Sequence, residues 1–352
     1  METLNTCSNT PLLKQTTCAY CGVGCGVDIS LLNNTPTKLE GTREHPANFG
    51  RLCVKGTHLL DTIGTDNRLT SPLIDNEPAS WDTATDYVAN KFNAIIKEHG
   101  PESVAFYVSG QLLTEDYYVA NKLMKGYIGS GNIDTNSRLC MSSAVAGYKR
   151  AFGEDVVPCT YEDLEQTELL ILIGSNAAWT HPVLYQRMER AKKLNPNMKV
   201  VVIDPRKTDT AELADIFLNI KPGSDGALYN GLLTYLSEHN YLDTQFINAH
   251  TNGFETALAE AKKWSVKAVS DFCDIDAQLV SDFYALFAQS PTAISFYSMG
   301  INQSSSGVDK CNAIINAHLA SGKLLKPGCG PFSITGQPNA MGGREVGGLA
   351  NQ

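Results

Sequence analysis

The sequence predicts an α/β fold whose larger part is Rossmann-like and contains a mainly parallel sheet. Two short apolar runs, Leu169–Ile173 and Val200–Ile203, are typical of strands buried on both faces. The segment between them has helical periodicity near Val183–Leu194, so strand, helix and strand form a βαβ unit. In addition, a group of cysteines near the N-terminus indicates a small separate domain that precedes the sheet.

Composition and charge limit the possible classes of protein. The chain has 352 residues, of which 43% are hydrophobic and 18% are charged. That length supports more than one domain, since single cores stop growing near ~250–300 residues. The net charge of −9 argues against nucleic acid as a partner. No apolar run is long enough for a membrane span, and the polar segment Met1–Pro11 lacks the features of an export signal, so we expect a cytoplasmic protein without a membrane partner.

Four cysteines near the N-terminus have the spacing of metal ligands. Cys18, Cys21 and Cys25 lie close together, and Cys53 follows alone, in the pattern C-x2-C-x3-C-x27-C. Structural zinc sites usually combine two close cysteine pairs or include histidine. Three close thiolates and a distant fourth suit the opposite sides of an iron–sulfur cluster, and the glycines between them allow a tight loop. We therefore predict a [4Fe–4S] cluster on these four cysteines, with zinc as the alternative.

Apolar periodicity predicts the remaining elements. The pattern after Trp81 has helical spacing, and His99–Gly100–Pro101 ends it. Further on, we expect a strand at 104–108, a helix at 115–128, helices at 225–238 and 255–263, and a strand at 293–297.

Two loops after predicted strands are candidates for nucleotide binding. Gly174-Ser175-Asn176 follows the first apolar strand, where Rossmann-like folds bind phosphate. Asp204 ends the next strand, where a carboxylate can accept from a ribose hydroxyl or a base N–H. This geometry alone suggests NAD, but the G-x-G-x-x-G fingerprint is absent, which weakens that interpretation.

An ordered set of motifs resembles the molybdopterin oxidoreductase superfamily, and most closely the catalytic subunits of bacterial assimilatory nitrate reductases. The segments are TTCAYCGVGCGVDI, GRLCVKG, NSRLCMSSAVAGY, LIGSNAAWTHPVL, GSDGAL, SMGINQ and GQPNAMGGREVGG. The resemblance extends from residue 16 to the end of the chain. It implies two cofactors: a [4Fe–4S] cluster and molybdenum held by two molybdopterin guanine dinucleotides.

The resemblance also implies roles for single residues. Lys55 would lie between the cluster and a pterin, and Cys140 would ligate molybdenum. Met141 follows that ligand, whereas formate dehydrogenases place a histidine there that can assist proton removal, so nitrate is favoured over formate. Arg344 would guide an anionic substrate, the alternative being a surface ion pair with Glu345. The implied contacts to the pterin cofactor are Gln111, Asn136, Gly174, Ser175, Asn176, Asp204, Gly223, Ser224, Asp225, Met299 and Gln303, with Asp225 on the guanine base.

The resemblance finally implies an activity and a division into domains. We expect reduction of nitrate to nitrite by oxygen-atom transfer, with electrons from ferredoxin, flavodoxin or an NADH-linked flavoprotein. A cytoplasmic molybdenum formate dehydrogenase and a non-catalytic iron–sulfur electron-transfer or binding module are the alternatives. Members of the family are longer, so we expect an N-terminal fragment that lacks a C-terminal domain. The expected domains are a cluster domain at 14–70, a discontinuous α/β domain at 71–135 plus 295–352, and a dinucleotide-binding domain at 136–294.

Overall fold

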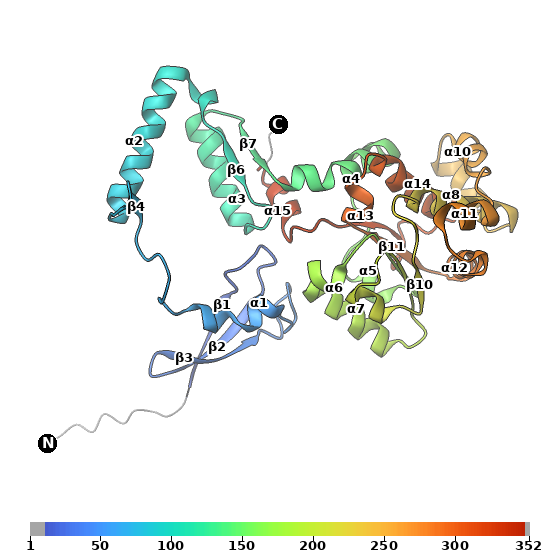
Figure 1. The fold of residues 1–352 in the computed structure, drawn as a ribbon, viewed down its shortest axis with the longest axis horizontal. Helices are drawn as coiled ribbons and strands as arrows, with labels where there is room; N and C mark the ends of the chain where they lie inside the picture. Colours follow the sequence, from blue (N-terminus) through green and yellow to red (C-terminus); the bar gives the residue numbers. More distant parts are fainter. Residues whose placement is uncertain (1–10, 349–352) are drawn as a thin grey trace. The chain divides into compact units, whose positions relative to one another are not determined.

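The computed structural model describes residues 11–348 and confirms the mixed α/β class (Figure 1). The chain divides into two compact units. The first contains the residues up to Arg138 together with those from Gln337 onward, and the second contains Leu139–Gly336. Residues 1–10, on which the expectation about an export signal depends, lie outside the described part. Among residues 11–348, none of the helices combines the length and apolar character needed to cross a bilayer.

A small antiparallel sheet opens the first unit. Its strands are paired in the order β1 (Leu12–Thr17), β2 (Gly26–Leu32) and β3 (Thr35–Gly41). Thr17 pairs with Gly26, so the whole cysteine-rich segment between them forms one loop at the end of this hairpin. The short helix α1 (Val54–Thr57) begins directly after Cys53.

The rest of the first unit is built around a two-stranded parallel sheet. Its elements are β4 (Leu73–Ile74), β5 (Glu77–Pro78), α2 (Trp81–His99), β6 (Phe106–Val108), α3 (Thr114–Asn121), β7 (Ile133–Thr135) and α15 (Ala340–Glu345). The predicted helix after Trp81 is confirmed, and the Ser80 side chain caps its N-terminus. The helix predicted for 115–128 changes from α to π geometry at Lys122 and ends at Gly129, which has a left-handed conformation.

A five-stranded parallel sheet forms the centre of the second unit. Its spatial order is β10 (Ile216–Leu218), β9 (Lys199–Ile203), β8 (Leu169–Ile173), β11 (Ala293–Tyr297) and β12 (Gly330–Ser333). The predicted strands β8, β9 and β11 are confirmed. The strand β12 was not predicted, because its sequence GPFS contains no apolar run.

Both faces of this sheet are covered by helices. Leu169, Ile171 and Ile173 belong to one hydrophobic core and Leu170 and Leu172 to the other, as the fully apolar strand requires. The first core is covered by α4 (Ser137–Phe152), α8 (Asp225–Glu238), α11 (Val266–Cys273), α12 (Ala277–Gln289), α13 (Met299–Asn302) and α14 (Gly307–Ala320). The second is covered by α5 (Asp163–Gln166), α6 (Ala177–Thr180) and α7 (Pro182–Leu194). Two further helices, α9 (Thr244–His250) and α10 (Phe254–Ala261), pack outside α8.

The strand order contains a topological switch point. From β8 the chain proceeds outward to β9 and β10, and then returns to place β11 on the other side of β8. Loops that leave β8 and β11 at their carboxyl ends therefore diverge in opposite directions, and open α/β sheets bind ligands in the crevice between such loops.

The domain boundary predicted between residues 294 and 295 differs from the observed division. It cuts β11, which pairs with both β8 and β12. Residues 295–336 thus complete the large sheet and lie in the second unit. The separate cluster domain at 14–70 stays a prediction.

Candidate functional site

The loop between β1 and β2 contains three of the four cysteines, Cys18, Cys21 and Cys25. The Cys18 N–H donates to the carbonyl of Cys25 at 2.8 Å and closes the loop. Gly24, inside the loop, has a φ of +65°, which an L side chain rarely adopts.

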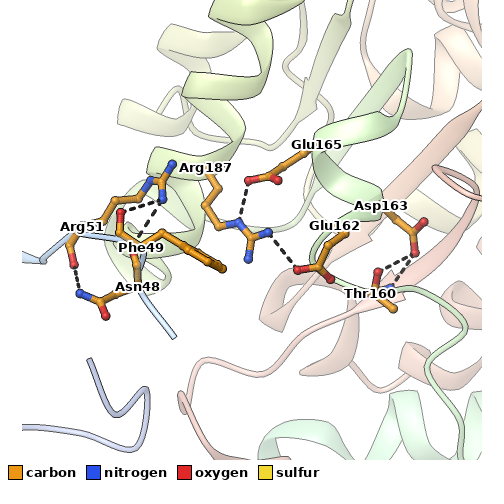
Figure 2. Close-up of polar contacts among 8 residues, drawn as sticks. All are labelled: Asn48, Phe49, Arg51, Thr160, Glu162, Asp163, Glu165 and Arg187. Carbon is orange, nitrogen blue, oxygen red and sulfur yellow. Dashed lines mark hydrogen bonds and ion pairs between the residues drawn. The ribbon is translucent and has the colours of Figure 1, made fainter. Parts of the chain in front are cut away.

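Asn48, which was not predicted as a site residue, connects the end of this loop to the segment that carries Cys53. Its side chain is fully buried, accepts from the N–H of Gly26 at 2.9 Å and donates to the carbonyl of Gly26 at 3.1 Å. It also donates to the carbonyl of Arg51 at 2.8 Å, two residues before Cys53 (Figure 2). One buried amide thereby fixes the distant fourth cysteine beside the first three.

The four thiols influence one another electrostatically. Burial, together with the charges of Cys21, Cys18 and Cys53, raises the pKa of Cys25 to about 12. Burial also raises the pKa of Cys18, while the nearby Lys55 lowers it. Four thiolates this close repel one another, and iron supplies the positive charge that stabilises them, so these residues fit a cluster.

The arrangement of these thiols differs from that of a single-ion site. In the described part of the chain, no three His, Cys, Asp or Glu side chains are placed to hold one metal ion. Sulfur ligands of a single zinc ion would lie about 3.8 Å apart, as Zn–S bonds of about 2.3 Å in a tetrahedron require. A four-iron cluster holds its thiolates farther apart than this. Thiols that influence one another electrostatically but are too far apart to share one metal ion therefore suit a cluster.

The cluster loop packs directly against the loop that follows β6. The Gly22 N–H donates to the carbonyl of Gln111 at 2.7 Å, and a Cβ at Gly22 would lie 2.2 Å from the carbonyl oxygen of Leu112. Asn136, at the end of β7, accepts from the N–H of Gly110 at 2.8 Å. The predicted pterin contacts Gln111 and Asn136 thus lie at the carboxyl ends of adjacent parallel strands, beside the cluster loop.

Arg344 lies in the last turn of α15, whose first residues return to the same loop. Asn339, which precedes α15, donates through its side chain to the carbonyl of Leu112 at 2.9 Å. The Arg344 guanidinium lies 4.0 Å from the carboxylate of Glu345, and the Glu345 side chain is largely exposed. An ion pair of this length with a solvent-exposed carboxylate contributes little stability.

Cys140 is buried in the first turn of α4, in the second unit. The Thr335 hydroxyl donates to its sulfur at 3.5 Å. The next residue, Met141, packs against the hydrophobic core and accepts from the side-chain amide of Asn302 at 3.5 Å. The sulfur of Cys140 is therefore held by the end of β12 and not by its own helix alone.

The predicted phosphate loop lies at the switch point of the sheet. Gly174 has a φ of +55°, and its carbonyl accepts from the N–H of Gly300 at 2.9 Å. A Cβ at Gly174 would lie 2.9 Å from the Cα of Gly300, so only glycine allows the β8 and β11 loops to approach this closely. The Ser175 hydroxyl is buried and has no hydrogen-bond partner within the described residues. A buried polar atom without a partner fits a site for a polar ligand such as a phosphate.

Asn176 and the residues at the end of α13 complete this edge of the sheet. The Asn176 side chain accepts from the hydroxyl of Thr210 at 3.0 Å. At the end of β11, the Ser298 hydroxyl donates to the sulfur of Met299 at 2.8 Å, and Gln303 is exposed at the end of α13.

Two predicted acidic contacts lie close to each other. Burial raises the pKa of Asp204 and the charge of Asp225 raises it further, against the opposing effect of Arg206. Asp225 begins α8 after a turn in which Gly223 has a φ of +90° and the Ser224 hydroxyl donates to the carbonyl of Lys221 at 2.6 Å. One carboxylate oxygen of Asp225 accepts from Lys310 at 2.7 Å, and both side chains are buried. Lys310 was not predicted as a site residue, because its partner is far away in the sequence.

The structure thus collects the predicted residues into two groups. The first unit contains the four cluster cysteines, Lys55, Gln111, Asn136 and Arg344. The second unit contains Cys140, Gly174, Ser175, Asn176, Asp204, Gly223, Ser224, Asp225, Met299 and Gln303.

Comparison with known proteins identifies the family. Residues 13–64 match the molybdopterin oxidoreductase Fe4S4 domain, and residues 68–352 match the molybdopterin oxidoreductase domain. The chain is 58% identical over 336 residues to a nitrate reductase of Klebsiella oxytoca, covering 96% of this chain and 38% of that protein. It is 38% identical over 346 residues to a periplasmic nitrate reductase of Desulfovibrio desulfuricans, covering 94% of this chain and 46% of that protein. It spans less than half the length of these relatives.

A solved structure shows the same fold. Acetylene hydratase from Pelobacter acetylenicus superposes with a TM-score of 0.72 at 21% identity, covering 90% of this chain and 44% of that one. With both family domains matched in order along the chain and the cluster cysteines gathered in the first of them, the chain belongs to the molybdopterin oxidoreductases, whose cofactors are a [4Fe–4S] cluster and molybdopterin.

Proposed function

We propose that this chain is part of an enzyme that reduces nitrate to nitrite at molybdenum, with electrons delivered through the [4Fe–4S] cluster. The observation that carries the proposal is the pair Cys140–Met141 at the start of α4. The thiol is buried and suits a soft metal, and the thioether beside it cannot take up a proton as a histidine would. The similarity to nitrate reductases supports the same substrate.

Each group of residues has a proposed task. Cys18, Cys21, Cys25 and Cys53 hold the cluster. Lys55, whose charge acts on Cys18, stabilises the negative charge that an added electron brings. Gln111 and Asn136 bind a pterin next to the cluster loop, which gives electrons a short path.

The second group binds the other parts of the cofactor. Cys140 ligates molybdenum, which supplies the oxygen-transfer chemistry when bound. Gly174, Ser175 and Asn176 bind phosphates, and Asp204 and Asp225 bind the ribose and guanine of a dinucleotide. Gly223, Ser224, Met299 and Gln303 are proposed further contacts to it, and Arg344 attracts the anionic substrate.

The proposal extends to the cellular role. We expect an assimilatory enzyme in the cytoplasm that receives electrons from ferredoxin, flavodoxin or an NADH-linked flavoprotein. Reduction with each purified donor in turn, followed by nitrite measurement, distinguishes among the three.

The decisive experiment measures metals and activity together. The protein purified with its cofactors is expected to contain iron and molybdenum and to form nitrite from nitrate with a reduced dye as donor. Cys140→Ala is expected to abolish nitrite formation and to retain iron. Cys159→Ala is the matched control, because Cys159 is also a buried thiol of the second unit.

Other results would point to the alternatives. Formate oxidation without nitrate reduction would identify a formate dehydrogenase. Iron without molybdenum in the purified protein would favour a non-catalytic iron–sulfur module. Full nitrate reduction by Cys140→Ala would contradict the proposed role of that thiol.

A further inference from the structure

Thr335 makes a buried contact with the proposed molybdenum ligand. It follows β12, and its hydroxyl donates to the Cys140 sulfur at 3.5 Å. Thr335 is 7% exposed and Cys140 is 4% exposed. Because both side chains are buried, water has little access to the sulfur. The hydrogen bond from the hydroxyl therefore acts in a low-dielectric environment, where it is stronger.

His181 fixes the backbone of Thr335 from the other side. This histidine lies between α6 and α7, is buried, and forms a hydrogen bond through Nε2 with the carbonyl oxygen of Thr335. Because a carbonyl can only accept, Nε2 carries the proton. The ring also packs edge-on against Phe296 of β11, with centroids 6.1 Å apart at 89°.

The histidine is itself held by the proposed phosphate loop. Its unprotonated Nδ1 accepts from the hydroxyl of Thr180 at 2.8 Å, and the same hydroxyl oxygen lies 3.0 Å from the carbonyl oxygen of Asn176, so its one proton is shared between the two acceptors. A continuous set of contacts therefore runs from Asn176 through Thr180, His181 and Thr335 to Cys140. It joins the loop after β8 to the end of β12, on the opposite side of β11.

We propose that Thr335 is a positioning residue that lowers the electron donation of the Cys140 thiolate to molybdenum, and that His181 holds Thr335 in place for this task. The inference rests on the proposed ligation of molybdenum by Cys140. A hydrogen bond to a thiolate sulfur withdraws electron density from the metal, and such bonds tune both the geometry and the potential of metal ligands. Thr335 thereby favours the reduced metal, and the histidine keeps its hydroxyl directed at the sulfur.

The test uses the holoenzyme and measures the metal as well as turnover. Thr335→Val preserves the shape of the side chain and removes the donor. The midpoint potential of the Mo(V)/Mo(IV) couple can be followed by electron paramagnetic resonance. In Thr335→Val we expect it to fall by about 59 mV, which for one electron corresponds to about a tenfold change in the equilibrium constant of the couple. Thr335→Ser retains the hydroxyl and is expected to keep the wild-type potential.

Two further variants separate positioning from stability. His181→Phe removes the bond to the Thr335 carbonyl and is expected to shift the potential in the same direction, whereas His181→Gln, whose amide can donate, restores part of it. Thr234→Val is the matched control, because the buried Thr234 hydroxyl donates to the carbonyl of Ala261 at 2.6 Å and belongs to α8, which contributes no residue to the set of contacts from Asn176 to Cys140. It is expected to lower stability without changing the potential.

A measurement on the wild-type protein covers the case in which a variant does not fold. Exchange into D2O is expected to shift the molybdenum–cysteine stretching band in the resonance Raman spectrum, since a hydroxyl donates to the sulfur. An unshifted band, or an unchanged potential in Thr335→Val at normal molybdenum content, would overturn the inference. If Cys140→Ala leaves the molybdenum signal unchanged, the proposed ligand itself is wrong, and the two failures are thus distinguishable.

Discussion

Lys310 and Asp225 form a buried ion pair beside the proposed guanine site. Their charged atoms lie 2.7 Å apart, and both side chains are nearly inaccessible. Removing one partner of such a pair leaves an uncompensated charge in a low-dielectric environment, which costs much more than the pair itself contributes. The lysine also keeps one oxygen of Asp225 engaged, which orients the carboxylate that we propose to contact guanine.

Replacing this lysine is expected to have a large effect on stability. Lys310→Met is expected to lower the free energy of unfolding by about 3–5 kcal/mol, measured by urea denaturation. Lys267→Met is the control, because the Lys267–Asp271 pair is exposed and should contribute no more than about 1 kcal/mol. Equal losses in the two variants would contradict the buried role of Lys310.

His318 is expected to make the second unit sensitive to acid. Burial lowers its pKa to about 3; the Lys323 carbonyl opposes this shift and the Lys323 charge adds to it. In the neutral ring, Nε2 accepts from the hydroxyl of Ser295 at 2.9 Å and Nδ1 donates to the carbonyl of Lys323 at 3.0 Å. Both ring nitrogens of the neutral form are therefore hydrogen-bonded.

The sign of the pH effect follows from this lowered pKa. An unfolded histidine binds a proton near pH 6.5, and the folded one does so only near pH 3, so stability falls as pH decreases through that window. Between pH 7 and pH 5 the loss from this residue is about 2 kcal/mol. Urea titrations at both pH values should show a smaller loss in His318→Gln than in wild type, whereas the exposed-site variant His250→Gln should behave like wild type.

Among the elements, the approach of the β8 and β11 loops decides the shape of the proposed phosphate site. Gly174 and Gly300 contact each other through their backbones, which leaves no space for a side chain. Since the two strands are separated by more than a hundred residues, the contact depends on the return of the chain to the other side of β8.

An alanine at this contact should be costly. Gly174→Ala combines a left-handed conformation with a clash, and is expected to lower the free energy of unfolding by about 1–2 kcal/mol for the conformation and by a further ~1–3 kcal/mol for the overpacking. Gly253→Ala isolates the first effect, because Gly253 has a φ of +75° and open space at its Cβ position. Urea denaturation measures both, and an equal loss would show that the loops separate freely.

The elements also show which parts of the fold the sequence could predict. The strands β8, β9 and β11 were recognised because a strand buried on both faces is apolar throughout. The strand β12 was missed because it forms a strand through its pairing with β11, and its own composition is not typical of a strand. The π-helical segment from Lys122 was also missed, since it is a short continuation of an α-helix and differs from it in the step of its backbone hydrogen bonds, which composition does not reveal.

At the scale of the whole molecule, the two units have separate hydrophobic cores. The cores around the large sheet contain only residues of the second unit, and Val104, Met124 and Ile133 form a core of the first. All four cluster cysteines belong to the first unit. Loss of the cluster should therefore destabilise one unit selectively.

Calorimetry can test this selectivity. In protein produced without molybdopterin, removing iron with a chelator is expected to lower one unfolding transition and to leave the other unchanged, because metal binding stabilises the unit that holds it. Cys53→Ser should reproduce the effect without the chelator. A single transition that shifts as a whole would mean that the two units unfold together.

By itself, the sequence predicted the four cysteines that we propose as cluster ligands, and it determined the main strands of the large sheet. The first three cysteines are local in the chain, the motif around Cys53 is distinctive, and fully apolar runs have few alternatives to a buried strand. Only the tertiary structure decided which distant residues meet: Asn48 beside the cysteine loop, Lys310 at Asp225, and Thr335 at the sulfur of Cys140. These contacts depend on strand order and on the return of the chain after β11. Hydrophobic periodicity does not encode either of them, because the periodicity specifies the face of an element on which a side chain lies and not the element that packs against that face.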